Sequence, residues 1–146
     1  MTSKWTLDTG SMQENFFSDA VLIGIVCPLP PYRFSWLINN TFDLNFTRES
    51  ELDICVQPAP DRQIFFPIYQ YYIPLSGGRY LIYKLKNGKD FLLQELRQLD
   101  YLWMIQSHNA DKDAESIIQE LRHINDLQLA QIIPLDRLKN KDNLLI

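Results

Sequence analysis

The sequence predicts an α+β fold of two layers, in which a mostly antiparallel, twisted sheet of six or seven strands carries two main helices on one face. Short, β-branched apolar runs recur along the chain and are separated by Pro, Gly and Asn, as expected of strands. Only two stretches, 31–42 and 111–124, carry apolar residues at helical spacing. The length of 146 residues suits one domain and is hardly enough for two.

Composition limits the class of protein. The chain is 46% hydrophobic and 22% charged, which is typical of a globular domain and excludes disorder and low complexity. The formal net charge of -4 counts against a general nucleic-acid binder, because such proteins are basic. Residues 1–15 are polar, so we expect a flexible leader before a single domain over 16–146. No signal-peptide pattern is present, and the longest apolar run, 20–27, is too short to cross a membrane. These features favour a cytoplasmic protein.

The first half of the chain opens with a strand and a helix. Residues 20–27 are apolar on both faces, as in a buried central strand. Three prolines follow, and a proline is tolerated in the first turn of a helix. The apolar stripe of the helix over 31–42 consists of Phe34, Leu37, Ile38, Thr41 and Phe42. Shorter strands are predicted over 44–47 and 52–56.

An aromatic hairpin is predicted next. Residues 63–73 have the composition of one long strand, and Pro67, which lacks an N–H donor, marks an edge or a bulge in it. The glycine pair 77–78 provides the turn into a strand over 79–86. Asn87-Gly88 then predicts a second, tight hairpin with a type I′ turn, because both residues tolerate positive φ. Its far arm is short, over 90–93.

The last third repeats the order strand, helix, strand. Residues 101–105 predict a buried strand, Asp111 is expected to cap the helix over 111–124, and 127–133 predict a strand that Pro134 ends. The first half has the same order of elements, with Asp19 and Asp100 at equivalent places. Two interpretations stay open: an internal duplication of a β-α-β unit, or the general likeness of any two such segments.

No catalytic, cofactor-binding or metal-binding residue can be assigned from the sequence. The five glycines form neither a G-x-G-x-x-G motif nor a P-loop. The two histidines, His108 and His123, are best interpreted as surface and helix-terminal residues. Cys27 and Cys55 each adjoin an apolar run, which favours two buried thiols that act as small hydrophobes.

Two features stand out from the rest of the sequence and indicate a partner contact. The hairpin over 64–86 is dense in aromatic residues, and Trp36 with Arg33 lies off the apolar stripe of the first helix. Tyrosine suits a surface that is sometimes wet, although such residues also occur in ordinary cores. The predicted contact residues are Phe65, Tyr69, Tyr71, Tyr72, Tyr80, Trp36 and Arg33. Asp100 and Asp19 are predicted to be structural, with carboxylates that cap backbone N–H groups.

Four segments resemble the IPExxVDY family, small proteins of Bacteroidota. The segments are Ala-Val-Leu-Ile-Gly-Ile at 20–25, Tyr-Arg-Phe-Ser-Trp-Leu-Ile-Asn at 32–39, Phe-Leu-Leu-Gln-Glu-Leu-Arg-Gln-Leu-Asp-Tyr-Leu at 91–102, and Leu-Lys-Asn-Lys-Asp-Asn-Leu-Leu-Ile at 138–146. Within the third, Leu99-Asp100-Tyr101 corresponds to the second half of the family signature. The resemblance implies a cytosolic protein with no assigned activity.

Together these observations favour a non-enzymatic interaction or accessory module that binds a protein partner or a second copy of itself through an exposed strand edge. The alternative is an RNA- or ribosome-associated factor that uses the aromatic hairpin and the basic residues over 79–89. An enzyme of unfamiliar type is the least favoured hypothesis, because no acid/base group of residues is visible. No cofactor is expected.

Overall fold

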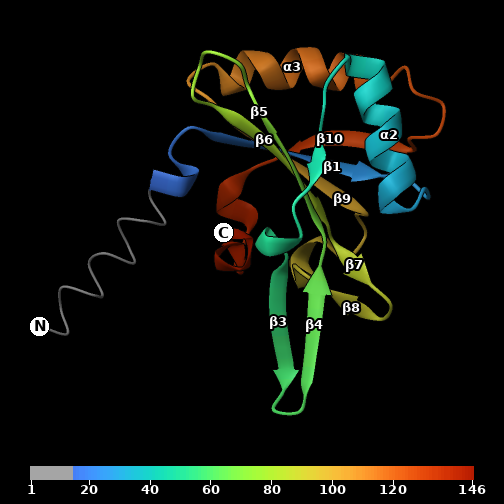
Figure 1. Cartoon of the computed structure of the whole chain (residues 1–146), viewed down its shortest axis with the longest axis vertical. Helices are drawn as coiled ribbons and strands as arrows, with labels where there is room; N and C mark the ends of the chain where they lie inside the picture. Colours follow the sequence, from blue (N-terminus) through green and yellow to red (C-terminus); the bar gives the residue numbers. More distant parts are fainter. Residues whose placement is uncertain (1–14) are drawn as a thin grey trace, which may run out of the picture.

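A six-stranded sheet forms the centre of the computed structural model, which describes residues 15–146 (Figure 1). The strand order is β10-β1-β9-β6-β5-β2, and every neighbouring pair is antiparallel. The strands are β1 (Ala20–Val26), β2 (Thr47–Arg48), β5 (Ile68–Tyr72), β6 (Arg79–Lys84), β9 (Tyr101–Gln106) and β10 (Leu129–Ile133). The leader predicted over 1–15 lies outside the described residues, apart from its last residue.

Both main helices, α2 (Pro31–Phe42) and α3 (Ala110–Leu121), lie on the same face of the sheet, so the predicted α+β class is confirmed (Figure 1). Pro31 begins α2, where its missing N–H costs nothing, and Asp43 ends it in the left-handed conformation at φ 54°. The prediction for the start of the second helix was wrong. Asn109 occupies the N-cap position, and Asp111 lies within the first turn, where its charge favours the helix dipole. The helix also ends at Leu121 rather than at 124.

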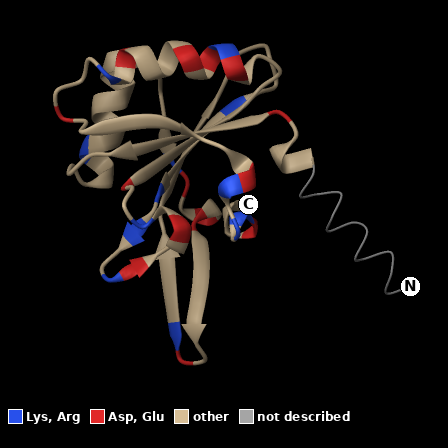
Figure 2. Cartoon of the chain, turned by 180° about the vertical axis from the view of Figure 1, so that it is seen from behind, with Lys and Arg blue, Asp and Glu red and all other residues tan. Residues whose placement is uncertain are grey.

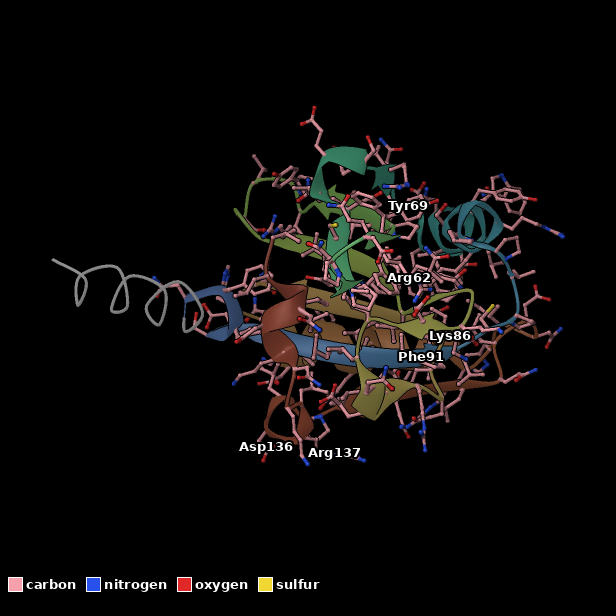
Figure 3. All side chains as sticks on the ribbon, turned by 90° about the horizontal axis from the view of Figure 1, so that it is seen from below. Arg62, Tyr69, Lys86, Phe91, Asp136 and Arg137 are labelled. Carbon is pink, nitrogen blue, oxygen red and sulfur yellow. The ribbon has the colours of Figure 1, made fainter. Side chains whose placement is uncertain are left out.

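The opposite face of the sheet is covered as well, which the two-layer prediction did not include. Two hairpins, β3 (Ile54–Ala59) with β4 (Arg62–Phe66) and β7 (Lys86–Asn87) with β8 (Asp90–Phe91), lie on this side together with the C-terminal segment (Figure 1). Short 3₁₀ helices complete the cover at Ser50–Leu52, Gln94–Leu96, Leu135–Arg137 and Lys141–Leu144. An ion pair of 2.6 Å between Arg62 and Asp90 joins the hairpins, and Figure 3 shows Arg62, Lys86 and Phe91 together on this side.

The long strand predicted over 63–73 is in fact two strands that belong to different sheets. Pro67 lacks the N–H that a continuous ladder would need, and the chain changes partner there. Phe65 pairs with Cys55 in the β3–β4 hairpin, whereas Tyr69 pairs with Ile82 in the main sheet. The short strand predicted over 44–47 is reduced to Thr47–Arg48.

The tight hairpin is present, but its turn differs from the predicted type. Asn87 pairs with Asp90, so the central residues are Gly88 and Lys89 rather than Asn87 and Gly88. Only Gly88, at φ 60°, has a positive φ there, which is the pattern of a type II′ turn. Glycine at the first central position is what this turn type requires.

Two β-α-β units are present, yet they are not equivalent. Since β9 and β10 both run antiparallel to β1, they are parallel to each other, and α3 connects them across one strand. By the same alternation β1 and β2 are parallel, but three strands lie between them. The two halves therefore share the order of their elements and not their place in the sheet.

Candidate interaction site

Three of the aromatic residues predicted to contact a partner pack into or against the core between the sheet and the helices: Tyr69 is buried, and Tyr71 and Tyr80 are half-buried. Tyr71 and Tyr80 stack with ring centroids 5.7 Å apart, and Tyr80 meets Trp103 edge to face at 5.6 Å. Tyr69 is 9% exposed and lies in the same apolar cluster. These side chains come together because β5 and β6 are neighbouring strands and the three residues lie on the sheet face that carries the helices. The prediction of an exposed surface was therefore wrong for Tyr69, whereas Tyr71 and Tyr80 are half-buried against the same cluster.

The other predicted contact residues are exposed but do not form one surface. Phe65 lies on β4 and Tyr72 lies at the end of β5, and these two strands belong to separate sheets. Trp36 and Arg33 lie on the outer side of α2. Trp36 is 67% exposed, and Tyr32, one turn earlier, is 70% exposed, so the pair shares one face of that helix. The exposure expected for Trp36 and Arg33 is therefore present, but the structure does not join this helix face to the hairpin, and its contact with a partner stays a prediction.

The basic residues near the hairpin do not form a basic surface either. Lys86 pairs with Asp100 at 3.0 Å. The ammonium group of Lys84 lies 4.6 Å from the centre of the Tyr101 ring, and partial burial lowers the pKa of Lys84. Figure 2 shows basic and acidic residues interspersed along the ribbon.

Asp100 and Asp19 have different surroundings. Asp100 lies between the ends of three neighbouring strands, where Oδ2 accepts a hydrogen bond of 2.9 Å from the Cys27 N–H and Oδ1 accepts one from Lys86 Nζ. Asp19 is exposed, and its carboxylate makes no hydrogen bond to the described residues. The geometry thus gives Asp100 the capping contact expected from the sequence, and it gives Asp19 none.

The two thiols also differ, so the prediction that both are buried was wrong for one of them. Cys27 is buried, and burial raises its pKa. Cys55 is exposed, because alternate residues of β3 face away from the sheet that the hairpin covers.

The edge strand β10 combines features that the other edge of the main sheet lacks. β2, at that other edge, has only two residues, whereas β10 has five, Leu-Ala-Gln-Ile-Ile, with neither a charge nor a proline. Natural edges are usually blunted by lysine, proline, bulges or short length. Leu129 is 40% exposed and Ile132 is 46% exposed. Among the described residues, no strand covers the outer side of β10.

The backbone of β10 presents hydrogen-bonding groups to this open side. Gln131 pairs with Gly24. The carbonyl of Val26, two residues further along β1, accepts a hydrogen bond of 2.8 Å from the N–H of Gln128, just before β10. Because N–H and C=O groups of successive residues point to opposite sides of a strand, Ala130 and Ile132 direct theirs away from β1. One of these groups has a weak partner, since Arg122 Nη2 lies 3.5 Å from the Ala130 carbonyl.

A groove lies beside this edge, between β10 and α3. It has a volume of about 350 Å³ and is lined by Glu115, Ile118, Gln119, Arg122 and Ile132. Its apolar part consists of Ile118 and Ile132. Its charged residues are Glu115, within α3, and Arg122, at the C-cap of α3 seven residues later. We refer to β10 and this groove together as the β10 edge.

Comparisons of the chain with protein-family models, curated proteins and solved structures found no match. The arrangement of the described residues is therefore the basis for a functional hypothesis. No cluster of three or more His, Cys, Asp or Glu suited to a metal ion occurs among residues 15–146. Within the same range, no helix has the length and apolar character needed to cross a membrane.

Sequence reasoning missed the β10 edge, although a signal was present. The strand predicted over 127–133 is present over Leu129–Ile133, and its lack of charge was visible in the sequence. What could not be seen was its position, because a buried central strand and an unprotected edge strand have the same apolar composition.

Proposed function

We propose that this protein is a non-enzymatic interaction module that forms a homodimer by pairing the β10 strands of two copies. The observation that carries the proposal is the open, uncharged edge of β10 with its exposed Leu129 and Ile132. Edge strands of this kind readily accept another strand. A second copy is the preferred occupant because the edge is complementary to itself.

The backbone pattern suits a two-fold symmetric pair. If two β10 strands lie antiparallel with Gln131 opposite Gln131, then Ala130 of each copy lies opposite Ile132 of the other. These are the residues whose N–H and C=O groups point outward, so each such pair exchanges two hydrogen bonds and the interface contains four. Ile132 of one copy then packs beside Ala130 of the other.

The charges beside the groove agree with the same symmetry. A two-fold axis near Ile118 and Gln119 places Glu115 of one copy opposite Arg122 of the other, because both residues lie at equal distances along α3 from that point. The groove brings Ile132 of β10 beside Ile118 of α3, so the proposal takes one two-fold axis to serve both the strand contact and the helix contact. Arg122 would exchange its long contact with the Ala130 carbonyl for a carboxylate partner.

The RNA-binding alternative has less support. It depended on the hairpin as an exposed stacking platform, but Tyr69 is buried, and the rings of Tyr71 and Tyr80 pack against each other and against Phe46. The resemblance to the IPExxVDY family stays part of the proposal, and it is compatible with an accessory protein that has no catalytic centre.

The experiment is a measurement of molar mass by sedimentation equilibrium over a range of protein concentrations. We expect the wild-type chain to approach twice its monomer mass of 17.2 kDa. Ile132→Lys places a charge against the partner strand and should give a monomer. Tyr72→Lys is the matched control, because Tyr72 is also exposed and apolar but lies away from β10.

Circular dichroism and thermal unfolding of both variants verify that each remains folded. A wild-type chain that stays monomeric at its highest soluble concentration contradicts the proposal. So does an Ile132→Lys variant that keeps the wild-type association. Loss of association in Tyr72→Lys alone would point to a different surface.

A further inference from the structure

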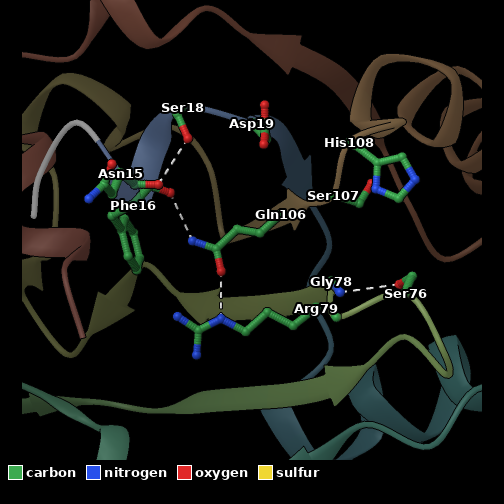
Figure 4. Close-up of a pocket in the computed structure, with 11 residues that line it drawn as sticks. Asn15, Phe16, Ser18, Asp19, Ser76, Gly78, Arg79, Gln106, Ser107 and His108 are labelled. Atoms are coloured by element: carbon green, nitrogen blue, oxygen red, sulfur yellow. Dashed lines mark hydrogen bonds between the residues drawn. The ribbon is translucent and has the colours of Figure 1, made fainter.

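A second site, distinct from the β10 edge, lies at the end of the three central strands. It is a polar pocket of about 520 Å³, which is within the size range of small-molecule sites. Its lining comes from the residues just before β1, the end of β9 and the start of β6, together with the turns beside β9 and β6. The residues are Asn15, Phe16, Ser18, Asp19, Ser76, Gly77, Gly78, Arg79, Gln106, Ser107 and His108 (Figure 4).

Arg79 is the principal feature of this pocket, because two glutamine side chains hold its guanidinium group in place. Arg79 Nε donates to Gln106 Oε1 at 2.5 Å, and Nη1 donates to Gln70 Oε1 at 2.8 Å (Figure 4 shows the first). Gln106 is itself fixed, since its Nε2 donates to the Phe16 carbonyl at 2.9 Å. Gln70 is a buried polar side chain, 7% exposed. A buried amide is costly unless it is hydrogen-bonded, so this network orients Arg79 rigidly.

The charge of Arg79 is not compensated by its partners. Both glutamines are neutral, and no carboxylate among the described residues forms an ion pair with Arg79. A guanidinium group has five N–H donors, and the two hydrogen bonds to glutamine use two of them. The three remaining donors, one on Nη1 and two on Nη2, are those with which arginine binds a carboxylate or phosphate group end-on.

The pocket around Arg79 adds further polar groups. Ser76, Ser107 and His108 line it. Gly78 lets β6 approach β9 closely here, because a Cβ at this position would lie 2.7 Å from the Gln106 carbonyl oxygen. Asp19 is the one acidic residue in the described lining, so a ligand with hydrogen-bond donors beyond its anionic group fits better than one with a second negative charge.

We propose that this pocket binds a small molecule through a carboxylate or phosphate group held by Arg79, with hydroxyl or amino groups on the rest of the ligand. The site belongs to each single chain and does not depend on the dimer.

The experiment is an NMR titration of the full-length ¹⁵N-labelled protein with inorganic phosphate and, separately, with acetate. Chloride at matched ionic strength is the control for general salt effects. We expect saturable shifts at the backbone N–H groups of Gly78, Arg79 and Ser107, and at the Arg79 Nε–H signal. A response to phosphate alone identifies a phosphoryl ligand, and a response to acetate alone identifies a carboxylate.

Arg79→Gln removes the charge and should weaken the apparent affinity about tenfold or more, because charge-assisted hydrogen bonds to the anion are lost. Arg33→Gln on the outer face of α2 is the matched control and should keep wild-type binding. Shifts that do not saturate, that chloride reproduces, or that persist in Arg79→Gln overturn the proposal. If Arg79→Gln does not fold, the chemical shift of the Arg79 Nε–H signal in the wild-type protein tests the proposal, because an anion that binds elsewhere does not change this shift.

Discussion

At the scale of single residues, Asp100 shows how one carboxylate can join several strands. Its side chain accepts hydrogen bonds from the backbone of Cys27 and from Lys86, and its own backbone groups bond to Ile25 and Leu85. The residue thereby links the end of β1, the segment after β6 and the start of β9. Asp19, at the equivalent place in the first half of the chain, accepts one backbone hydrogen bond from the Ser107 N–H, but its carboxylate makes none to the described residues. The two aspartates that look alike in the sequence therefore differ in the structure.

Asp100→Ala is expected to lower the free energy of unfolding by about 1–3 kcal/mol, because it leaves the partly buried Cys27 N–H without its acceptor and Lys86 without its partner. Asp19→Ala is the matched control and should change stability by less than about 0.5 kcal/mol, as is usual for surface substitutions. Urea unfolding followed by circular dichroism measures both. Equal effects of the two substitutions would argue against a special role for Asp100.

At the scale of elements, the sequence predicts the two helices and the main strands well, because their apolar spacing is set by burial on one face or on both. It cannot predict which strands are neighbours, since pairing is decided by contacts distant in the chain. Pro67 illustrates this limit. Its missing N–H indicated an interruption, but whether the strand would bulge or change sheets depended on β3, which the sequence did not connect to it.

The same limit explains the error at the candidate site. A dense group of tyrosines is compatible with a core and with a surface, and only the position of β5 and β6 beneath the helices distinguishes the two. For the β10 edge and the Arg79 pocket, the relevant residues come from segments far apart in the chain. Gln70 and Gln106, for example, are brought to Arg79 only by the order β5-β6-β9.

This placement gives a clear expectation for two neighbouring tyrosines. Tyr69→Lys buries a charge in the core and should destabilise the fold by about 3 kcal/mol or more. Tyr72→Lys, three residues later on the same strand, alters a side chain that is 66% exposed and should change stability by less than about 0.5 kcal/mol. Thermal unfolding compares them. If the Tyr69→Lys protein is stable but has lost association, the partner contact includes β5 and this interpretation is contradicted.

At the scale of the whole molecule, the layers determine where a partner can bind. Helices cover one face of the sheet, and hairpins with the C-terminal segment cover the other (Figure 1). Both faces are therefore occupied within one chain, which leaves the edges of the sheet for strand pairing. Of the two edges, only β10 is long enough to add a strand in register.

The proposed symmetry can be tested through the charges on α3, independently of the strand itself. Glu115→Arg places two arginines together at each of the two equivalent contacts, and Arg122→Glu places two glutamates together. Each single variant should weaken dimerisation about tenfold, because like charges at an interface repel. The double variant Glu115→Arg/Arg122→Glu restores opposite charges and should recover most of the affinity. Sedimentation equilibrium at two salt concentrations measures the effect, and salt should lessen both the loss and the recovery. If the double variant loses as much dimerisation free energy as the two single variants combined, Glu115 and Arg122 do not meet across the axis, and the two copies pair in another register.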